Sequence, residues 1–314
     1  MPKKTRRLSS EEVSRQEISQ IVTELRQVFQ VPIKLLLRVV KVPRSTYYYA
    51  RTHRQQERLD DSPIIQAIDE IRQEDAKYTK KYGYRRLTKA LQERGFTVNH
   101  KRVLRLMHEH DWLCLAYNRQ KRKYNSYKGT VGKIAPNRLN RRFKTDRPYQ
   151  KLVTDVSEFR YGGMSQNDRV YLEPVIDLFS GEVLAFNISD HPTVEFALKP
   201  LREALEGLPK LGYRTTVHTD QGFQYQHKFW RETLKEHRVF QSMSRKATCL
   251  DNAVVESFFH IMKVEVMDEH FENKEDLIQA MTDWINFYNK RRIKTKLDGK
   301  SPEKYRELTI QQAA

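Results

Sequence analysis

Two kinds of hydrophobic spacing follow one another along the chain and change near residue 150. In the first half, apolar residues recur three and four positions apart, which is typical of amphipathic helices. In the second half, several short runs are rich in β-branched and aromatic residues, which is typical of strands. We therefore predict a helical first half and a second half that mixes strands and helices.

The first half predicts two helix-turn-helix units. Residues 1–58 contain "PIKLLLRVVKVPRSTYYYAR", a short apolar helix, a break at Pro43 and a basic, aromatic helix, although the usual Gly of the turn is missing. Residues 59–118 contain a helix that begins at Ser62, and then "YGYRRLTKALQERGFTVNHKRVLRLMHEH", which predicts a helix, a turn at Gly95, a cap at Asn99 and a second helix. The expected buried positions are Leu87, Ala90, Leu91, Val103, Leu104 and Met107.

The second half predicts the element order βββαβαβα. The runs "YQKLVTDVSEFRY", "DRVYLEPVIDLFSG" and "EVLAFNISD" predict an antiparallel meander. The helix "TVEFALKPLREALEGL", the strand "YRTTVHTDQG", a helix over residues 225–236, the strand "RVFQSM" and a last helix follow. This is the order of an RNase H-like core, so the predicted fold class is α/β, a mixed sheet flanked by helices and preceded by helix-turn-helix domains. The expected divisions are 1–58, 59–118, a basic linker over 119–148, a catalytic core over 149–290 and a tail over 291–314.

The net charge of +18 lies entirely in the first half. Residues 1–150 hold 35 Lys and Arg against 15 Asp and Glu, and residues 151–314 hold 23 against 25. The stretch 119–147, here called the basic arm, has eleven Lys and Arg and one acid, with no sustained period. Because the last predicted helix of 59–118 has Lys101, Arg102 and Arg105 near its start, it suits docking into a DNA groove. The asymmetry favours a polyanion-binding half joined to a nearly neutral module.

Composition excludes several other classes. No stretch approaches the roughly 20 apolar residues of a membrane span, and the amino terminus lacks a signal peptide's apolar segment. The two cysteines, Cys114 and Cys249, exclude a disulfide scaffold and a four-cysteine zinc site. His108, His110 and Cys114 lack a fourth partner, so we interpret them as flanking a packing turn. The expected location is the cytoplasm, in association with the bacterial nucleoid.

Three acids fall at informative places in the predicted core. Asp155 interrupts the first strand, Asp220 ends the fourth strand, and Glu256 stands in the otherwise apolar last helix, where Asp251 or Asn252 can cap the start. An ionised carboxylate is costly to bury unless a charge or a metal answers it. In this fold the first and fourth strands are neighbours and the last helix crosses their ends, so we expect the three carboxylates to converge.

The stretch "TDVSEF…HTDQGFQYQ…MSRKATCLDNAVVESFFHIMK…YNKRR…SPEKY" closely resembles transposases of bacterial insertion sequences in the retroviral-integrase superfamily. The resemblance is to the branch whose element carries a short upstream frame before the integrase-like frame, and it runs from about residue 60 to the end. It implies that Asp155, Asp220 and Glu256 are an Asp-Asp-Glu catalytic triad. Lys263 matches the family's basic residue two turns along the same helix, and "YGYRRL" and "VNHKRVLRLM" match its DNA-binding region.

The resemblance also implies the reaction and its partners. Such a transposase binds the terminal inverted repeats, nicks the ends to free 3′-hydroxyls and catalyses strand transfer to target DNA. Carboxylate oxygens suit Mg²⁺ or Mn²⁺, and we expect two ions per active site. The expected DNA contacts are Arg85, Arg86, Lys101, Arg102, Arg105, Lys263 and Arg292.

Assembly and three alternatives stay open at this point. Two element ends and one triad per chain predict a homodimer or a higher even-numbered assembly on DNA, and the product of the upstream frame is a further candidate partner. An apolar stripe could serve as core or as interface: Leu277, Ile278, Met281, Trp284, Ile285 and Tyr288. The alternatives are a non-catalytic DNA-binding regulator derived from a transposase, a tyrosine recombinase using Tyr288 with Arg291 and Arg292, and a plain RNase H-type nuclease.

Overall fold

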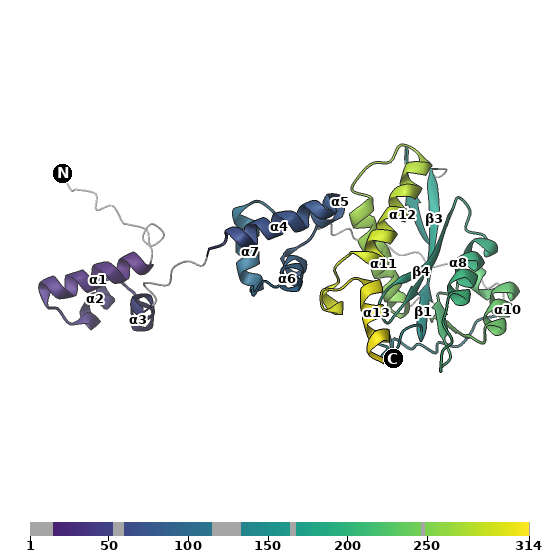
Figure 1. Ribbon diagram of the computed structural model, residues 1–314, viewed down its shortest axis with the longest axis horizontal. Helices are drawn as coiled ribbons and strands as arrows, with labels where there is room; N and C mark the ends of the chain where they lie inside the picture. The colour runs from purple at the N-terminus through teal and green to yellow at the C-terminus, as the bar shows by residue number, and fades with distance from the viewer. Residues whose placement is uncertain (1–14, 53–59, 115–132, 164–167, 246–248, 314) are drawn as a thin grey trace. The chain divides into compact units, whose positions relative to one another are not determined.

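The computed structural model describes residues 15–52, 60–114, 133–163, 168–245 and 249–313 (Figure 1). The chain divides into two compact units, Met1–Ser62 and Pro63–Ala314. The first part of the basic arm, residues 119–132, lies outside the described residues. Among the described residues, no helix is both long enough and apolar enough to cross a membrane.

The first unit is a small three-helix bundle. It contains α1 (Arg15–Phe29), α2 (Ile33–Val39) and α3 (Arg44–Thr52), packed around Val22, Leu37 and Tyr47. Lys41, between α2 and α3, has a φ of +54°, a conformation that a non-Gly residue adopts rarely. The predicted break before the third helix is therefore present. Lys41 adopts the positive φ that the usual glycine of such a turn would adopt.

The second unit begins with four helices. They are α4 (Ser62–Glu74), α5 (Ala76–Thr79), α6 (Tyr84–Glu93) and α7 (His100–Glu109). The predicted turn and cap between α6 and α7 are confirmed, since Gly95 has a φ of +89° and the Asn99 side chain accepts a hydrogen bond from the amide of Lys101. Leu104 was expected to be buried but is only half-buried, and Leu106 is buried in its place.

A six-stranded mixed sheet follows. Its strands are β1 (Lys151–Thr154), β2 (Ser157–Arg160), β3 (Arg169–Asp177), β4 (Val183–Ser189), β5 (Thr216–Thr219) and β6 (Phe240–Met243). β1 runs parallel to β5 and β5 parallel to β6, while β3 is antiparallel to β1, β2 and β4. The predicted order and the antiparallel meander are confirmed, and the fold is RNase H-like.

The long strand β3 spans a break in its neighbour. Thr154 of β1 pairs with Val175, and Ser157 of β2 pairs with Leu172 farther along the same strand. β1 and β2 are therefore one line of chain, interrupted at residues 155–156. Because β3 continues past the gap, the sheet stays intact while Asp155 is released from regular pairing.

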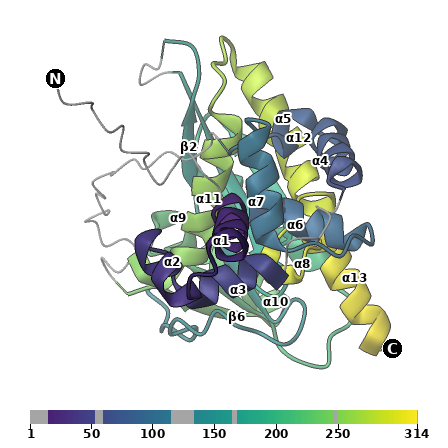
Figure 2. The same cartoon turned by 90° about the vertical axis from the view of Figure 1, so that its left-hand side faces the viewer.

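Helices cover both faces of the sheet (Figures 1 and 2). On one face, α8 (Val194–Glu206), α9 (Phe223–Gln226) and α10 (Lys228–Glu236) pack on Leu152, Val175 and Val217. On the other, α11 (Ala253–Val266) and α12 (Lys274–Lys290) pack on Val153 and Ile176. The single helix predicted over 225–236 is two helices, α9 and α10, which meet at His227.

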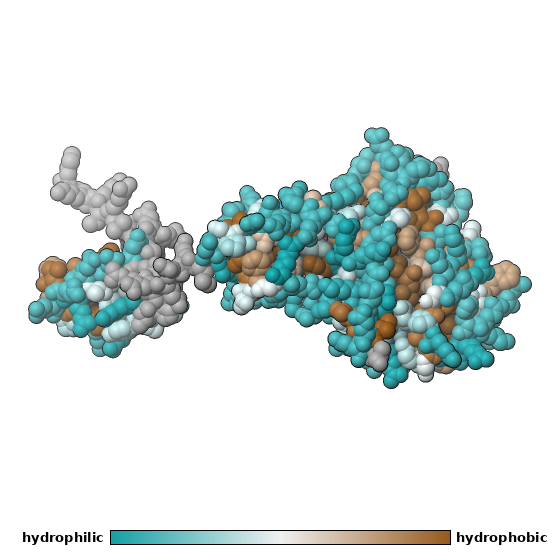
Figure 3. Space-filling view, in the orientation of Figure 1, coloured by the Kyte–Doolittle hydropathy of each residue, from teal (hydrophilic) through white to brown (hydrophobic). Residues whose placement is uncertain are grey.

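The carboxyl-terminal elements bury the apolar stripe within the same chain. Besides α12 they include the short helix η2 (Thr295–Leu297) and α13 (Pro302–Ala313). Leu277, Met281, Trp284, Ile285 and Tyr288 are buried, and Ile278 is half-buried. The same core includes α4, α6 and α7, and the Tyr78 ring stacks on Phe287 with centroids 4.5 Å apart. Hydrophilic side chains cover most of the face drawn in Figure 3, as expected when the stripe is inside.

Candidate active site

Two of the three predicted acids leave the same edge of the sheet. Asp155 follows the last residue of β1, and Asp220 follows the last residue of β5. These strands are parallel neighbours, with Val153 beside His218, so the two aspartates stand at equivalent positions. Glu256 is in the first turn of α11, which contacts β1, and Asn252 just before α11 donates to Asp155.

The charges of the other two acids act on Asp155. Burial raises the pKa of Asp155 well above its usual range, and the negative charges of Asp220, Glu173 and Glu256 raise it further. Burial also raises the pKa of Asp220, against a hydrogen bond from the amide of Gly222, and the pKa of Glu256. Like charges so arranged disfavour ionisation of all members. In the ranges that the structure covers, however, no three His, Cys, Asp or Glu side chains are close enough to hold a metal ion between them.

Glu256 is exposed, which corrects the expectation of a buried carboxylate. The apolar face of α11 is buried in the core and consists of Val255, Phe258, Phe259 and Met262. Glu256 follows Val255, and successive residues of a helix point about 100° apart, so its side chain leaves the apolar face. Asp155 and Asp220 are half-buried, so the three carboxylates form a partly open acidic surface.

Local hydrogen bonds fix both aspartates. Asp155 Oδ1 accepts from the amide of Val156 at 2.8 Å, and its Oδ2 accepts from Asn252 Nδ2 at 3.1 Å. Asp220 Oδ1 accepts from the amide of Gly222 at 2.7 Å. A Cβ on Gly222 would stand 2.9 Å from that oxygen, so a larger residue there would displace the Asp220 carboxylate from this position.

Asn252 is a site residue that sequence reasoning considered only as a helix cap. Its side chain does not cap the start of α11. Nδ2 donates to Asp155, and Oδ1 is buried and has no hydrogen-bond partner within the part of the chain that the structure describes. A buried acceptor left unsatisfied costs roughly 1–3 kcal/mol. The cost makes Oδ1 a ready acceptor for a group that enters the acidic surface.

The preceding residue, Asp251, was the other predicted cap and is a structural anchor instead. Its buried carboxylate accepts hydrogen bonds from Arg245 Nε at 2.9 Å, from Arg141 Nε at 2.8 Å and from Asn137 Nδ2 at 3.0 Å. The hydrogen bonds from Arg245, with those from Arg141, hold the pKa of Asp251 far below its usual range despite burial. The hydrogen bonds from Arg141 and Asn137 connect the described end of the basic arm to Asp251, the residue before Asn252.

A fourth carboxyl group, Glu173 on β3, was missed by the sequence analysis. It is fully buried, and its Oε1 accepts from Thr154 Oγ1 at 2.5 Å and from Tyr225 Oη at 2.9 Å. Burial raises its pKa to about 8, although both hydrogen bonds lower it. The run "VYLEPVID" gives no signal that Glu173 is buried, because a lone Glu in a strand usually faces solvent.

Lys263 is on α11, two turns after Glu256. Its Nζ donates to Ser157 Oγ at 2.6 Å and stands 4.9 Å from the centroid of the Phe159 ring. Both partners belong to β2, directly after the break at Asp155. Lys263 is half-buried, and its ammonium group lies beside the strand that follows Asp155.

The predicted DNA-contacting residues of α6 and α7 divide by exposure. Arg85, Lys101 and Arg105 are exposed, and Arg102 is half-exposed. Arg105 also pairs with Glu109 at 2.8 Å within its own helix. These four side chains remain candidates for phosphate contacts.

Burial contradicts the prediction that Arg292 contacts DNA. The side chain is 2% exposed, and its Nε and Nη2 donate to Glu265 at 2.9 and 2.6 Å. Arg86 points to the same carboxylate, with its Nη1 3.6 Å away. Glu265 also accepts from Trp284 Nε1 at 3.0 Å, so this cluster joins α6, α11 and α12 from within.

The residues considered for a tyrosine recombinase and for a zinc site are not among the acids described above. Tyr288 is 4% exposed and its hydroxyl accepts from Lys294 Nζ at 2.9 Å, so it is not accessible as a nucleophile toward DNA. The exposed His110 stacks on Trp112, and Cys114 Sγ donates to the carbonyl oxygen of Lys81.

Three family models match the chain. Residues 145–249 and 256–310 match two models described as integrase core domains, and residues 58–122 match an HTH-like domain. Among solved structures, the catalytic core domain of HTLV-2 integrase in complex with magnesium aligns at 17% identity and a TM-score of 0.41, covering 52% of this chain and 99% of that one. The fold assignment rests on the strand order and on the family models.

Curated relatives match over nearly their whole length. The InsK transposase of insertion sequence element IS150 from Escherichia coli (strain K12) is 42% identical over 292 residues, which cover 92% of this chain and 98% of the relative. The InsF transposase of insertion sequence IS3A from the same organism is 34% identical over 289 residues, which cover 88% and 95%. The chain therefore belongs to the insertion-sequence transposases of the integrase superfamily.

Proposed function

We propose that this transposase binds the terminal inverted repeats of its element, nicks their ends to free 3′-hydroxyls and joins these ends to target DNA by strand transfer. Family membership supports the class of activity. One observation supports the chemistry: Asp220 and Glu256 both raise the pKa of Asp155, so acids from two strands and a helix act on one place.

The donor set fits a hard divalent cation. Carboxylate oxygens suit Mg²⁺ or Mn²⁺, and the mutual repulsion of Asp155, Asp220 and Glu256 would be relieved by positive charge. The unpartnered Oδ1 of Asn252 adds an oxygen acceptor beside them. Asp155, Asp220 and Glu256 would hold the metal, proposed as two ions, once their side chains move closer together than they lie in this structure. When bound, such ions stabilise the attacking and leaving oxygens of an in-line displacement at phosphorus.

Residues of the chain itself orient the carboxylates of the site. Backbone amides and Asn252 keep the carboxylates of Asp155 and Asp220 in fixed orientations. In the first step, water attacks a phosphodiester at the element end and the 3′-oxygen leaves as a free hydroxyl. In the second step, that hydroxyl attacks a phosphodiester of the target and displaces its 3′-oxygen. Neither step needs a covalent bond between protein and DNA.

A cleavage assay tests the proposal. The protein is incubated with duplexes carrying its own element ends and Mg²⁺, and the nicks are mapped at nucleotide resolution. Asp155→Asn, Asp220→Asn and Glu256→Gln should each lower nicking and joining by at least about a thousand-fold, a loss on the scale of removing a principal electrostatic contributor. End binding should change little. EDTA should stop the wild-type reaction, and Mg²⁺ or Mn²⁺ should restore it.

The matched control is Asp283→Asn, an exposed acid on α12 whose side chain accepts only from Gln279 in the described part of the chain. It should cut and join like the wild type. Substantial joining by any one triad variant would remove that residue from the site. Tight, end-specific binding by a wild-type protein that never nicks would instead identify a non-catalytic regulator.

A further inference from the structure

An arginine cluster lies at the opposite end of β5 and β6 from the acids. It consists of Arg138 on the described end of the basic arm, Arg214 before β5, and Arg238 before β6, all exposed. Asp220 follows the carboxyl end of β5, six residues after Arg214. At about 3.3 Å per residue, the cluster and the acidic surface are therefore roughly 20 Å apart.

One aromatic ring organises two of the three guanidinium groups. The guanidinium carbon of Arg138 is 4.5 Å from the centroid of Phe240, and that of Arg214 is 3.8 Å from it. Because these distances share one end, the two carbons are at most 8.3 Å apart. Such stacking restricts the two guanidinium groups before an anion binds. Binding an anion then costs these side chains less conformational entropy.

The edge strand explains how the arm delivers Arg138. The amides of Arg138 and Leu139 donate to Ser242 Oγ on β6 at 2.9 and 3.2 Å, and the amide of Ala135 approaches Met243 Sδ at 3.3 Å. The arm therefore lies along β6 and sets its arginine on Phe240. Through this contact, the arginine cluster is continuous with the basic arm.

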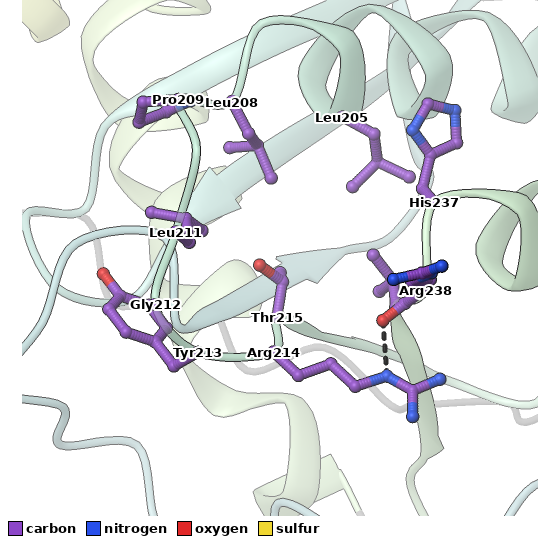
Figure 4. A pocket seen from close by; sticks show the side chains of 11 residues that line it. Leu205, Leu208, Pro209, Leu211, Gly212, Tyr213, Arg214, Thr215, His237 and Arg238 are labelled. Atoms are coloured by element: carbon purple, nitrogen blue, oxygen red, sulfur yellow. Dashed lines mark hydrogen bonds between the residues drawn. The ribbon is translucent and has the colours of Figure 1, made fainter.

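Figure 4 shows the Arg214 side chain extended beside a pocket of about 550 Å³. Its Nε donates to the carbonyl oxygen of Arg238, which holds the Arg214 side chain in place, and its two terminal nitrogens make no hydrogen bond to any described residue. No carboxylate in the described ranges forms an ion pair with Arg138, Arg214 or Arg238. Positive groups this close repel each other unless an anion lies between them.

We propose that the arginine cluster binds the phosphate backbone of duplex DNA that follows the basic arm past the edge of the core. The inference rests on the proposed function, because DNA is the polyanion that a transposase handles. Guanidinium groups match phosphate oxygens in pairs, and they contact the backbone without reading sequence. The cluster then adds affinity away from the acids and leaves the choice of the cleaved bond to other residues.

Salt dependence of DNA binding by the full chain tests the proposal. The double variant R138Q/R214Q should bind roughly ten-fold more weakly, and its plot of log K against log salt should lose about 1.8 from the slope, or about 0.9 for each phosphate contact removed. The loss should be equal for an element-end duplex and for an unrelated duplex of the same length. R138K/R214K keeps both charges and should keep most of the slope.

The control R94Q/R202Q removes two arginines that pair with Glu70, Glu74 and Glu195, so it lowers the net charge equally and should keep the wild-type slope. Equal slopes for R138Q/R214Q and this control would overturn the proposal. Unchanged DNA binding together with loss of binding to polyglutamate would also overturn it, in favour of an acidic protein partner. Nicking of a saturating end duplex by R138Q/R214Q should equal that of the wild type. Failure of the proposed function would differ, because the wild type itself would then not nick.

Discussion

At the scale of single residues, Glu173 is the most consequential side chain near the acids that is not one of them. With a pKa of about 8, it keeps its proton at neutral pH. A protonated Glu173 adds no negative charge beside Asp155, so its charge raises the pKa of Asp155 only once Glu173 ionises above about pH 8. Its hydrogen bonds with Thr154 and Tyr225 also connect β3 to the residue before Asp155 and to α9.

This burial predicts a pH-dependent stability. The folded pKa of Glu173 is raised from 4.5 to about 8, so its contribution is complete below pH 4.5 and is lost as the pH rises through 8. Glu173→Gln cannot ionise. Its free energy of unfolding, relative to the wild type, should therefore increase by on the order of 4 kcal/mol from pH 4.5 to pH 9. Denaturant unfolding at a series of pH values measures this difference, and parallel curves for the two proteins would contradict it.

The three acids were proposed from the sequence, but their surroundings were not. Asp155 and Asp220 could be predicted to meet because strand order alone makes their strands neighbours. The exposure of Glu256, the orientation of Asn252 and the position of Glu173 depend on how side chains face in three dimensions. A linear pattern with one charge in an apolar run leaves that direction open.

At the scale of elements, Glu265 and Arg292 join helices that are distant in sequence. The motif "NKRR" indicated a basic surface, but the buried partner of its last arginine lies 27 residues earlier, on α11. The adjacent Arg291 stays 62% exposed in its side chain and pairs with Asp75. Two neighbouring arginines thus have opposite roles, and nothing in their local sequence separates them.

We predict different costs for removing these two arginines. Arg292→Met leaves Glu265 buried with a weakened set of partners and should lower the free energy of unfolding by about 3–5 kcal/mol. Arg291→Met, at an exposed ion pair, should cost less than about 1 kcal/mol. Equilibrium denaturation of both variants measures the contrast.

A second substitution separates charge from shape. In the double variant E265L/R292M no carboxylate is left unpaired, so much of the loss seen with Arg292→Met should be recovered. If the double variant is less stable than the single one, the packing of Arg292 rather than its charge holds these helices together.

At the scale of the whole molecule, each chain supplies one set of acids, and an insertion sequence has two ends. We predict that the complex active on paired ends contains two chains or a higher even number. Mass measurement of the protein bound to two end duplexes, with Mg²⁺ replaced by Ca²⁺ to hold the complex before cleavage, gives the number of chains. An active complex with a single chain would rule out this arrangement. The apolar stripe of α12 is inside the core, so the contact between chains must use other surfaces.

The helices after residue 62 show where sequence reasoning reaches its limit. Their periodicity, cap and turn could be predicted because these depend on residues a few positions apart. Their packing on α12 could not, since it depends on pairs such as Tyr78 with Phe287 and Tyr82 with Ile293. The amide of Ile293 donates to the Tyr82 hydroxyl across 211 positions of sequence.

This long separation has a consequence for synthesis of the protein. The helices α4, α6 and α7 leave the ribosome well before α12, whose residues complete their core. At roughly 5–20 residues per second, about 200 residues take roughly 10–40 s to translate. During that interval the nascent helices present apolar faces that α12 covers in the folded chain. The core shared by these helices and α12 is therefore completed only after residues 274–290 have been translated.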